Sequence, residues 1–497
     1  MSAAWPWVIL GRIPRIVSIP SDAEADEAAF KAADFPIRVA RPPQVAAVTV
    51  GPLAHPDPNE PDKYPYVLAA GPDCLLLNFA VAPSTGVDSA VSAQDRAYLV
   101  VARGFRAGGG AQAQQQGHAA VPVGEPIPVR GRDDVAMPAG YKALRSVGLV
   151  ASYDGRYTVA ELVVYNGADR ASLLRFRSGD DRWTRTDLSF PLAAEHSDWV
   201  PYGVVAQKET LWWFDLSWGL LSCDISVDDP VLLFHKLPED RGLWTVHMPV
   251  QPDTHRCVTV SHRELRYVEI ILEDRGGGGG SDKEAAAATV SMWTRRRIAA
   301  DPAGWEWQKN YAVSFEKIWN DGTYKDTGLP RKVPVLSAVC PSNPDLVYFS
   351  LERWLFGVDV PKHKVMEVAD EPHELVNLPF LQTPASCRYV HAWNVPPRVA
   401  KDLGLVGFSS SDEDEDQAEE MDEEELYKLG LEVAMGMDPS TLKSEVDKFF
   451  EGPKIPSPER EVMNQLRPPF SFCLTEKEAD ADLRKVDRLV KKRRLGD

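Results

Sequence analysis

Short runs of apolar residues, separated by turn residues, dominate the chain from about residue 36 to residue 395. The runs are Val45–Val50, Cys74–Ala80, Ala97–Ala102, Ala160–Tyr165, Leu173–Phe176, Val231–Phe234, Cys257–Val260, Leu265–Leu272, Leu346–Phe349 and Trp354–Val360. Short runs of this kind are typical of β-strands, and pairs such as Asp154-Gly155 and Asp321-Gly322 between them are typical of turns. No helical periodicity of similar strength occurs in this span. The pattern therefore predicts an all-β region.

The segment Leu211–Asp224 holds three tryptophans and a phenylalanine among Leu and Asp residues. Large flat side chains at this density are typical of half-buried β-strands, where they pack on a pleated surface. The segment contains no catalytic grouping of residues. It therefore predicts how the chain folds rather than a reaction.

A turn followed by an aromatic strand that ends in an acidic residue recurs at Leu211–Asp215, Leu265–Glu269 and Leu355–Asp359. Units of roughly 40–55 residues, each with about four strands, are what the blades of a β-propeller need. No repeated W-D or kelch signature accompanies the pattern. We predict a mainly β fold with a β-propeller-like domain of antiparallel strands, in which most tryptophans pack between blades. A large two-sheet sandwich is the competing interpretation.

The character of the sequence changes near residue 400. Asp412–Glu425 carries eleven carboxylates and no basic residue, so this segment must repel itself and stay solvated. Beyond it, Asp438 and Thr475 are candidate helix N-caps ahead of amphipathic patterns. We therefore predict an acidic disordered linker and a short α-helical C-terminal region. The predicted domains are an N-terminal extension over residues 1–35, the β-propeller-like domain over 36–400, the linker over 401–437 and the helical region over 438–497.

Composition limits the class of protein and its partners. The 497 residues are 44% hydrophobic, enough for a large core, and carry a formal net charge of −18, which argues against nucleic acid as a partner. The six cysteines form no C-x-x-C pair, as expected of buried free thiols. Prolines and an arginine interrupt the apolar N-terminus, and no run approaches the ~20 apolar residues of a membrane span. We expect no membrane association and a cytoplasmic and/or nuclear location.

Motifs for catalysis and metal binding are missing from the sequence. There is no G-x-S-x-G, and His247, His255 and His262 lack the spacing of a zinc site. The glycine run Gly276–Gly280 is not followed by the Lys-Ser/Thr pair of a phosphate loop, and carboxylate pairs such as Asp180-Asp181 lie in turn-like segments. We therefore predict no catalytic residue, cofactor or metal. Ten histidines leave open a triad that only the fold would assemble.

The C-terminal part offers two candidate modification and targeting sites. Ser409, Ser410 and Ser411 precede a run of acidic residues, as an acidophilic kinase requires, and phosphates there would deepen the negative charge. Lys491, Lys492, Arg493 and Arg494 form a basic cluster of the type that directs nuclear import. The competing interpretations are an unmodified solvated linker and the solvated face of a helix.

Several ordered motifs resemble one family. Leu211–Asp224 is followed by R-Y-V-E-I, V-S-M-W-T and G-L-P-R-K-V-P-V, which lead into P-S-N-P-D-L-V-Y-F-S-L-E-R-W-L-F-G-V-D at Pro341–Asp359. With the opening W-V-I-L-G-R-I-P-R, this order resembles the plant, largely grass-expanded family called domain of unknown function 1618. The resemblance covers roughly residues 5–400 and implies no known activity. The segment Gly276–Ala288 departs from it as an inserted loop.

These observations favour a non-enzymatic protein-interaction module with an unidentified protein partner. The rigid β domain would offer one surface, and the acidic linker with the C-terminal helices would add a second contact. The alternative is a hydrolase or glycan-active enzyme with its site in a propeller channel. Convergent charged side chains in one concave pocket would favour the enzyme, and a channel filled by Trp and Leu would oppose it.

Overall fold

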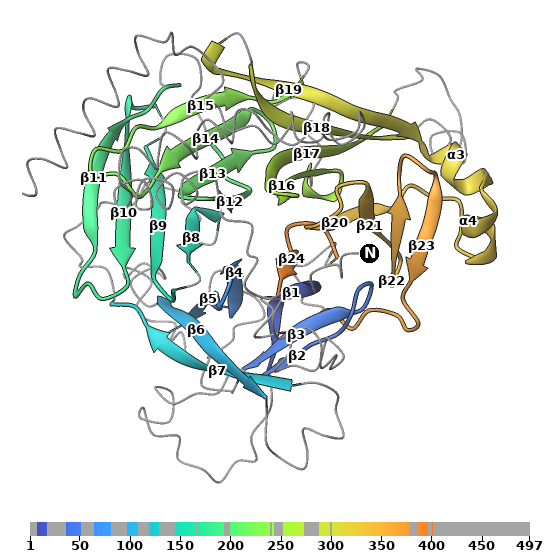
Figure 1. Cartoon of the computed structure of the whole chain (residues 1–497), viewed down its shortest axis with the longest axis horizontal. Helices are drawn as coiled ribbons and strands as arrows, with labels where there is room; N and C mark the ends of the chain where they lie inside the picture. The colour runs from blue at the N-terminus through green and yellow to red at the C-terminus, as the bar shows by residue number, and fades with distance from the viewer. Residues whose placement is uncertain are drawn as a thin grey trace, which may run out of the picture. The chain divides into compact units, whose positions relative to one another are not determined.

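The predicted strands assemble into a six-bladed β-propeller in a computed structural model of the chain (Figure 1). The structure describes residues 7–16, 36–50, 64–80, 97–107, 119–128, 145–152, 154–165, 167–192, 199–238, 241–242, 252–272, 288–298, 301–376, 383, 385–395 and 400. The competing two-sheet sandwich is therefore wrong. The predicted linker and C-terminal helical region lie outside the described residues.

Five blades are built from four consecutive antiparallel strands each. Blade 1 has β4 (Tyr66–Ala70), β5 (Cys74–Ala80), β6 (Ala97–Ala107) and β7 (Ala119–Pro126). Blade 2 has β8 (Val147–Ala151), β9 (Tyr157–Val164), β10 (Arg170–Arg177) and β11 (Thr184–Ser189). Blade 3 has β12 (Gly203–Gln207), β13 (Thr210–Asp215), β14 (Gly219–Asp224) and β15 (Leu233–Lys236). Blade 4 has β16 (Arg256–Ser261), β17 (Glu264–Ile271), β18 (Thr289–Ile298) and β19 (Asp301–Ser314). Blade 5 has β20 (Val335–Val339), β21 (Leu346–Leu351), β22 (Trp354–Asp359) and β23 (Lys364–Val368).

Blade 6 closes the ring with strands from both ends of the domain. Its order is β24 (Val390–Asn394), β1 (Trp7–Ile16), β3 (Val45–Val50) and β2 (Ile37–Arg38), with β1 antiparallel to β24 and parallel to β3. The predicted N-terminal extension over residues 1–35 is therefore wrong for Trp7–Ile16, which lies inside a sheet. Pro14 and Arg12 interrupt the apolar pattern of this strand, and the burial of its flanking residues becomes evident only from its pairing with β24.

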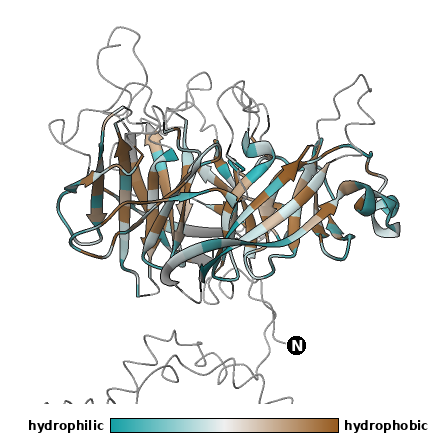
Figure 2. Cartoon of the chain, turned by 90° about the horizontal axis from the view of Figure 1, so that it is seen from above, coloured by the Kyte–Doolittle hydropathy of each residue, from teal (hydrophilic) through white to brown (hydrophobic). Residues whose placement is uncertain are grey.

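The strands are apolar on both faces because each blade packs between two others. On β13, Trp213 packs in the cluster shared with blade 2, whereas Trp212 packs in the cluster shared with blade 4. The half-buried strands that the aromatic density predicted are in fact covered on both sides. Hydrophobic residues accordingly concentrate along the blades in the side view (Figure 2). Trp213 and Trp293 are fully buried, which confirms inter-blade packing for these two tryptophans.

Two details depart from the predicted pattern. Short helices α3 (Phe315–Asn320) and α4 (Gly322–Asp326) follow β19, with Ser314 and Asp321 as their N-caps, so the region is not purely β. The acid-terminated repeat is only partly in register. Asp215 ends the second strand of blade 3 and Glu269 lies within the second strand of blade 4, whereas Asp359 ends the third strand of blade 5. No helix among the described residues is long and apolar enough to cross a membrane.

Candidate functional site: the central channel

The inner strands of all six blades line a channel at the centre of the ring. These strands are β4, β8, β12, β16, β20 and β24. The cavity in this channel has a volume of about 70 Å³. Its wall is closely packed between blades 2 and 3, where a Cβ on Gly148 would lie 2.7 Å from Cγ1 of Val204. The channel is therefore a defined cavity with tight walls.

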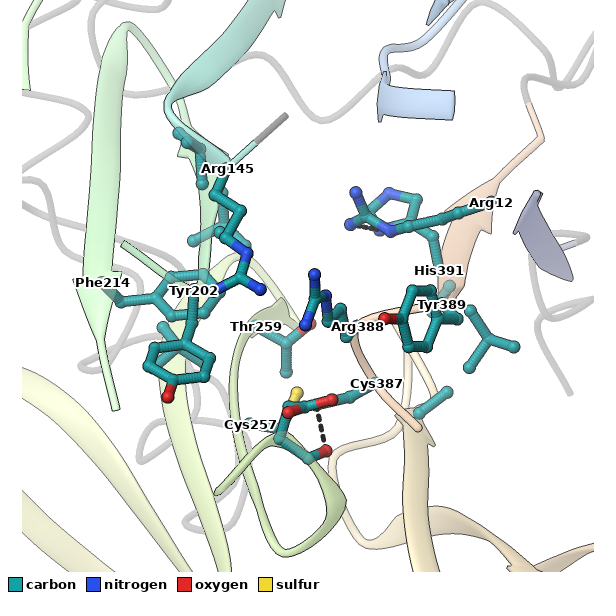
Figure 3. A pocket seen from close by; sticks show the side chains of 18 of the residues that line it. Arg12, Arg145, Tyr202, Phe214, Cys257, Thr259, Cys387, Arg388, Tyr389 and His391 are labelled. Atoms are coloured by element: carbon teal, nitrogen blue, oxygen red, sulfur yellow. Dashed lines mark hydrogen bonds between the residues drawn. The ribbon is translucent and has the colours of Figure 1, made fainter. Parts of the chain in front are cut away.

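Three arginines among the lining residues extend into this cavity, which we call the channel cluster: Arg12, Arg145 and Arg388. Arg12 comes from β1, Arg145 precedes β8, and Arg388 precedes β24. Figure 3 shows their guanidinium groups directed toward a common space from different sides. Residues far apart in the sequence thus meet at one place.

Each of these arginines lies over a tyrosine ring. The Cζ atom is 5.4 Å from the ring centroid for Arg145 over Tyr202, 4.9 Å for Arg388 over Tyr389 and 6.0 Å for Arg12 over Tyr66. A guanidinium over an aromatic face is attracted by the ring quadrupole, and its N–H donors remain in its own plane. The rings therefore orient the cations without using their hydrogen-bond donors.

The donors of Arg12 are partly used by the fold. Its Nη1 donates to the carbonyl of Leu68 at 2.7 Å, and its Nη2 lies 3.2 Å from Nδ1 of His391. Burial, with the charge of Arg12 beside it, lowers the pKa of His391 to about 3, so this ring is neutral at pH 7 and its Nδ1 accepts. The Nε of Arg12 is buried and makes no hydrogen bond within the described part of the chain.

Arg145 and Arg388 differ from Arg12 because nothing described in the structure accepts from them. No hydrogen bond or ion pair joins either guanidinium to another residue that the structure describes. Burial lowers the pKa of Arg145, and the positive charge of Arg388 lowers it further. Two like charges therefore face each other in a partly desolvated cavity, an arrangement that an anion would stabilise.

The described lining of the channel holds one carboxylate, that of Asp253 in the 3-10 helix η7 (Pro252–Thr254). Its Oδ2 accepts from the hydroxyl of Ser386 at 2.8 Å. Asp253 is near enough to oppose the lowering of the Arg145 pKa, but its effect is smaller than those of burial and Arg388. Burial also raises the pKa of Tyr202 and of Tyr389, so both hydroxyls are neutral donors at pH 7. The described lining is therefore rich in hydrogen-bond donors and positive overall.

A second group of charged residues lies between blades 3 and 4, and we call it the seam cluster: the buried Arg256 and Glu269 and the half-buried Arg241. Glu269 accepts from Nη2 of Arg256 at 2.8 Å and from Nε and Nη2 of Arg241 at 2.9 and 2.7 Å. Arg256 also donates to the carbonyl of Leu216 at 2.7 Å, which joins the two blades. Every charge in the seam cluster thus has a partner of opposite sign.

The residues singled out in the sequence do not form this site. Ser409, Ser410, Ser411, Lys491, Lys492, Arg493, Arg494 and His247 lie outside the described residues. His255 is half-buried beside Thr254, whereas His262 is exposed in a turn. In the described ranges no three His, Cys, Asp or Glu residues are placed to hold a metal ion, and the five described cysteines are free thiols.

Sequence comparison matches part of blades 3 to 5 to a known protein family. Residues 213–348 match the model of a family described as "Protein of unknown function (DUF1618)". We call these residues the DUF1618 segment, after the family that they match. It runs from β13 to β21 and confirms the family resemblance over this part of the chain. Arg12, Arg145 and Arg388 lie outside the DUF1618 segment, so the family match does not cover the channel cluster. A comparison with curated proteins found no match.

Several solved structures are similar at low identity. The α-L-arabinofuranosidase Arb93A from Fusarium graminearum is 11% identical with a TM-score of 0.29, over 69% of this chain and 87% of that chain. The β-propeller domain of Nup133 from Vanderwaltozyma polyspora is 9% identical with a TM-score of 0.29, over 64% and 78%. A chain of a mitotic checkpoint complex is 9% identical with a TM-score of 0.27, over 61% and 63%. None of these likenesses assigns an activity.

Proposed function

We propose that the protein is a non-enzymatic binding module that receives an anionic group of a protein partner in its central channel. The observation that carries the proposal is the pair Arg145 and Arg388, whose guanidinium groups converge with no acceptor among the described residues. A buried or half-buried charge without a partner costs free energy. A bound anion would remove that cost and accept the free N–H donors.

The composition of the lining favours binding over glycan hydrolysis. Most glycosidases need two carboxyl groups that flank the scissile bond. Among the described lining residues Asp253 is the single carboxylate, and Ser386 already donates to it. The alternative of a glycan-active enzyme thus lacks a catalytic pair in the described part of the channel, although convergent charges are present as an enzyme would require.

Propellers often mediate protein interactions, and their rigid rings hold side chains from several blades in fixed positions. In this chain Tyr66 donates from its hydroxyl to the carbonyl of Arg388 at 2.6 Å, which ties blade 1 to the closing segment.

The acidic linker, with Ser409–Ser411, and the C-terminal region remain our proposed second contact. A cytoplasmic and/or nuclear location remains part of the same proposal.

Calorimetric titration of the full chain with small anions tests this function. We expect binding that weakens as the salt concentration rises and that falls at least tenfold in Arg145→Met or Arg388→Met. Arg182→Met is the matched control, because Arg182 is exposed and lies outside the channel lining. Equal binding by the control and both channel variants would contradict an anion site in the channel.

A further inference from the structure

We infer that the anion is a phosphate monoester. This inference rests on the proposed function and specifies the ligand of the same channel. Its support comes from the charge of the lining, the directions of the donors and the buried donor left without an acceptor.

The charge of the channel matches a dianion. The described lining contains three arginines and one aspartate, so positive formal charges exceed negative ones by two. His391 does not change this excess at pH 7, because its low pKa keeps the ring neutral. A phosphate monoester carries a charge of roughly −1.5 to −2 at this pH. A single carboxylate would leave about half of the excess uncompensated.

The donors approach from several directions rather than in one plane. Arg145 extends from the start of blade 2, Arg388 from the segment ahead of β24, and Arg12 from β1 (Figure 3). A carboxylate has two oxygens in one plane and suits one guanidinium fork. A phosphate monoester has three terminal oxygens arranged in a pyramid. The phosphate can therefore accept from guanidinium groups on different sides of the channel.

Further donors lie beside the arginines. Tyr389 and Thr259 line the same cavity, and Figure 3 shows the hydroxyl of Tyr389 directed toward Arg388. The buried Nε of Arg12 has no acceptor among the described residues, although the Nη atoms of the same side chain are bonded. An unsatisfied buried donor in a native structure calls for an explanation, and a bound anion would supply one.

Arginine suits this ligand better than lysine would. The guanidinium is planar, always charged and weakly hydrated, and it can bind two phosphate oxygens at once while one face stacks on an aromatic ring. The Cζ atoms of Arg145 and Arg388 lie over the rings of Tyr202 and Tyr389, close enough for such a contact. Arg145→Lys would keep the positive charge but lose the paired N–H donors of the guanidinium. This variant therefore separates phosphate recognition from general attraction of anions.

Calorimetric titration of the full chain at pH 7.5 with five probes tests the inference. The probes are glucose 6-phosphate, a phosphoserine peptide, sulfate, succinate and acetate. We expect one or both phosphorylated probes to bind at least tenfold more tightly than succinate and acetate. Arg145→Met and Arg388→Met should each lose at least tenfold of this affinity, Arg145→Lys should lose a smaller factor, and Arg182→Met should lose none.

Each other outcome is decisive. Succinate or acetate binding as tightly as both phosphorylated probes would overturn the phosphate assignment and leave the anion-binding function standing, and sulfate binding more tightly than either would do the same. If none of the probes binds to a wild-type chain that unfolds cooperatively, both the phosphate assignment and the anion-binding function are overturned. A preference for the peptide supports a phosphorylated protein partner, whereas a preference for the sugar phosphate keeps the phosphate assignment and contradicts the protein partner. Unfolding curves of all variants distinguish lost binding from lost folding.

Discussion

The seam cluster and the channel cluster contain the same cation in two different settings. In the seam, Glu269 accepts three hydrogen bonds from Arg241 and Arg256, and both arginines are held between blades. In the channel, Arg145 and Arg388 lie over tyrosine rings and have no acceptor among the described residues. A buried cation that the fold requires brings its own partner, whereas a cation without one is available to a ligand.

The largest loss of stability should come from a substitution in the seam cluster. Glu269→Gln removes the carboxylate that accepts from Arg241 and Arg256, so the buried Arg256 loses its charged partner. Removing one partner of a buried pair costs about 3–5 kcal/mol of stability. Denaturant unfolding of the full chain measures this loss.

Glu352→Gln serves as the control for the seam. Glu352 pairs with Lys332 at 3.4 Å, and both side chains are more than half exposed. Such a pair contributes about 0–1 kcal/mol. If Glu269→Gln were no more harmful than this control, the seam cluster would not hold the blades together.

An intermediate loss of stability is expected from a larger side chain in the channel wall. A Cβ at position 148 would lie 2.7 Å from Cγ1 of Val204 and 3.0 Å from both Cδ atoms of Leu211, so Gly148→Ala forces these buried side chains to shift. Overpacking of this kind costs about 1–3 kcal/mol. A stability within error of wild type would mean that the wall is looser than its packing implies, and that the channel is less well defined.

Acid should destabilise the domain through His391. Its folded-state pKa, about 3, lies below the unfolded value near 6.5, so the unfolded chain binds the proton first. The contribution of His391 is present above the unfolded pKa and is lost as the pH falls toward the folded pKa. For this half-buried ring we expect a loss of about 1–2 kcal/mol between pH 7 and pH 5.

Unfolding curves at the two pH values measure the acid effect. His391→Gln should reduce the pH dependence, because glutamine does not titrate. Other groups contribute a background, including His235, whose pKa burial also lowers to about 3. An unchanged pH dependence in His391→Gln would show that this ring is not held in the neutral form.

Much of the fold was predictable from local patterns. Val45–Val50 and Cys74–Ala80 are strands with the predicted bounds, since alternating or continuous apolar residues flanked by turn residues determine strand position directly. Strand β1 was missed because its pairing partner, β24, lies at the other end of the domain. Long-range pairing of this kind leaves no local signal in a single sequence.

The candidate site was not predictable for the same reason. Arg12 and Arg388 are separated by most of the domain, and only ring closure brings them together. The one local hint is an isolated arginine within an apolar strand, as in W-V-I-L-G-R-I at Trp7–Ile13. Such a residue is as often paired within the fold, as Arg256 is by Glu269. Only the three-dimensional arrangement distinguishes the two cases.

The free energy of unfolding of Arg388→Met, measured in buffer without oxyanions, tests the central claim most directly. If the channel cluster serves a ligand, losing this cation should leave stability within about 1 kcal/mol of wild type, because only its contact with the ring of Tyr389 is lost. Relief of its repulsion with Arg145 would even raise stability. A loss of about 3–5 kcal/mol, equal to that expected for Glu269→Gln, would contradict the account and make Arg388 a structural residue of the ring closure.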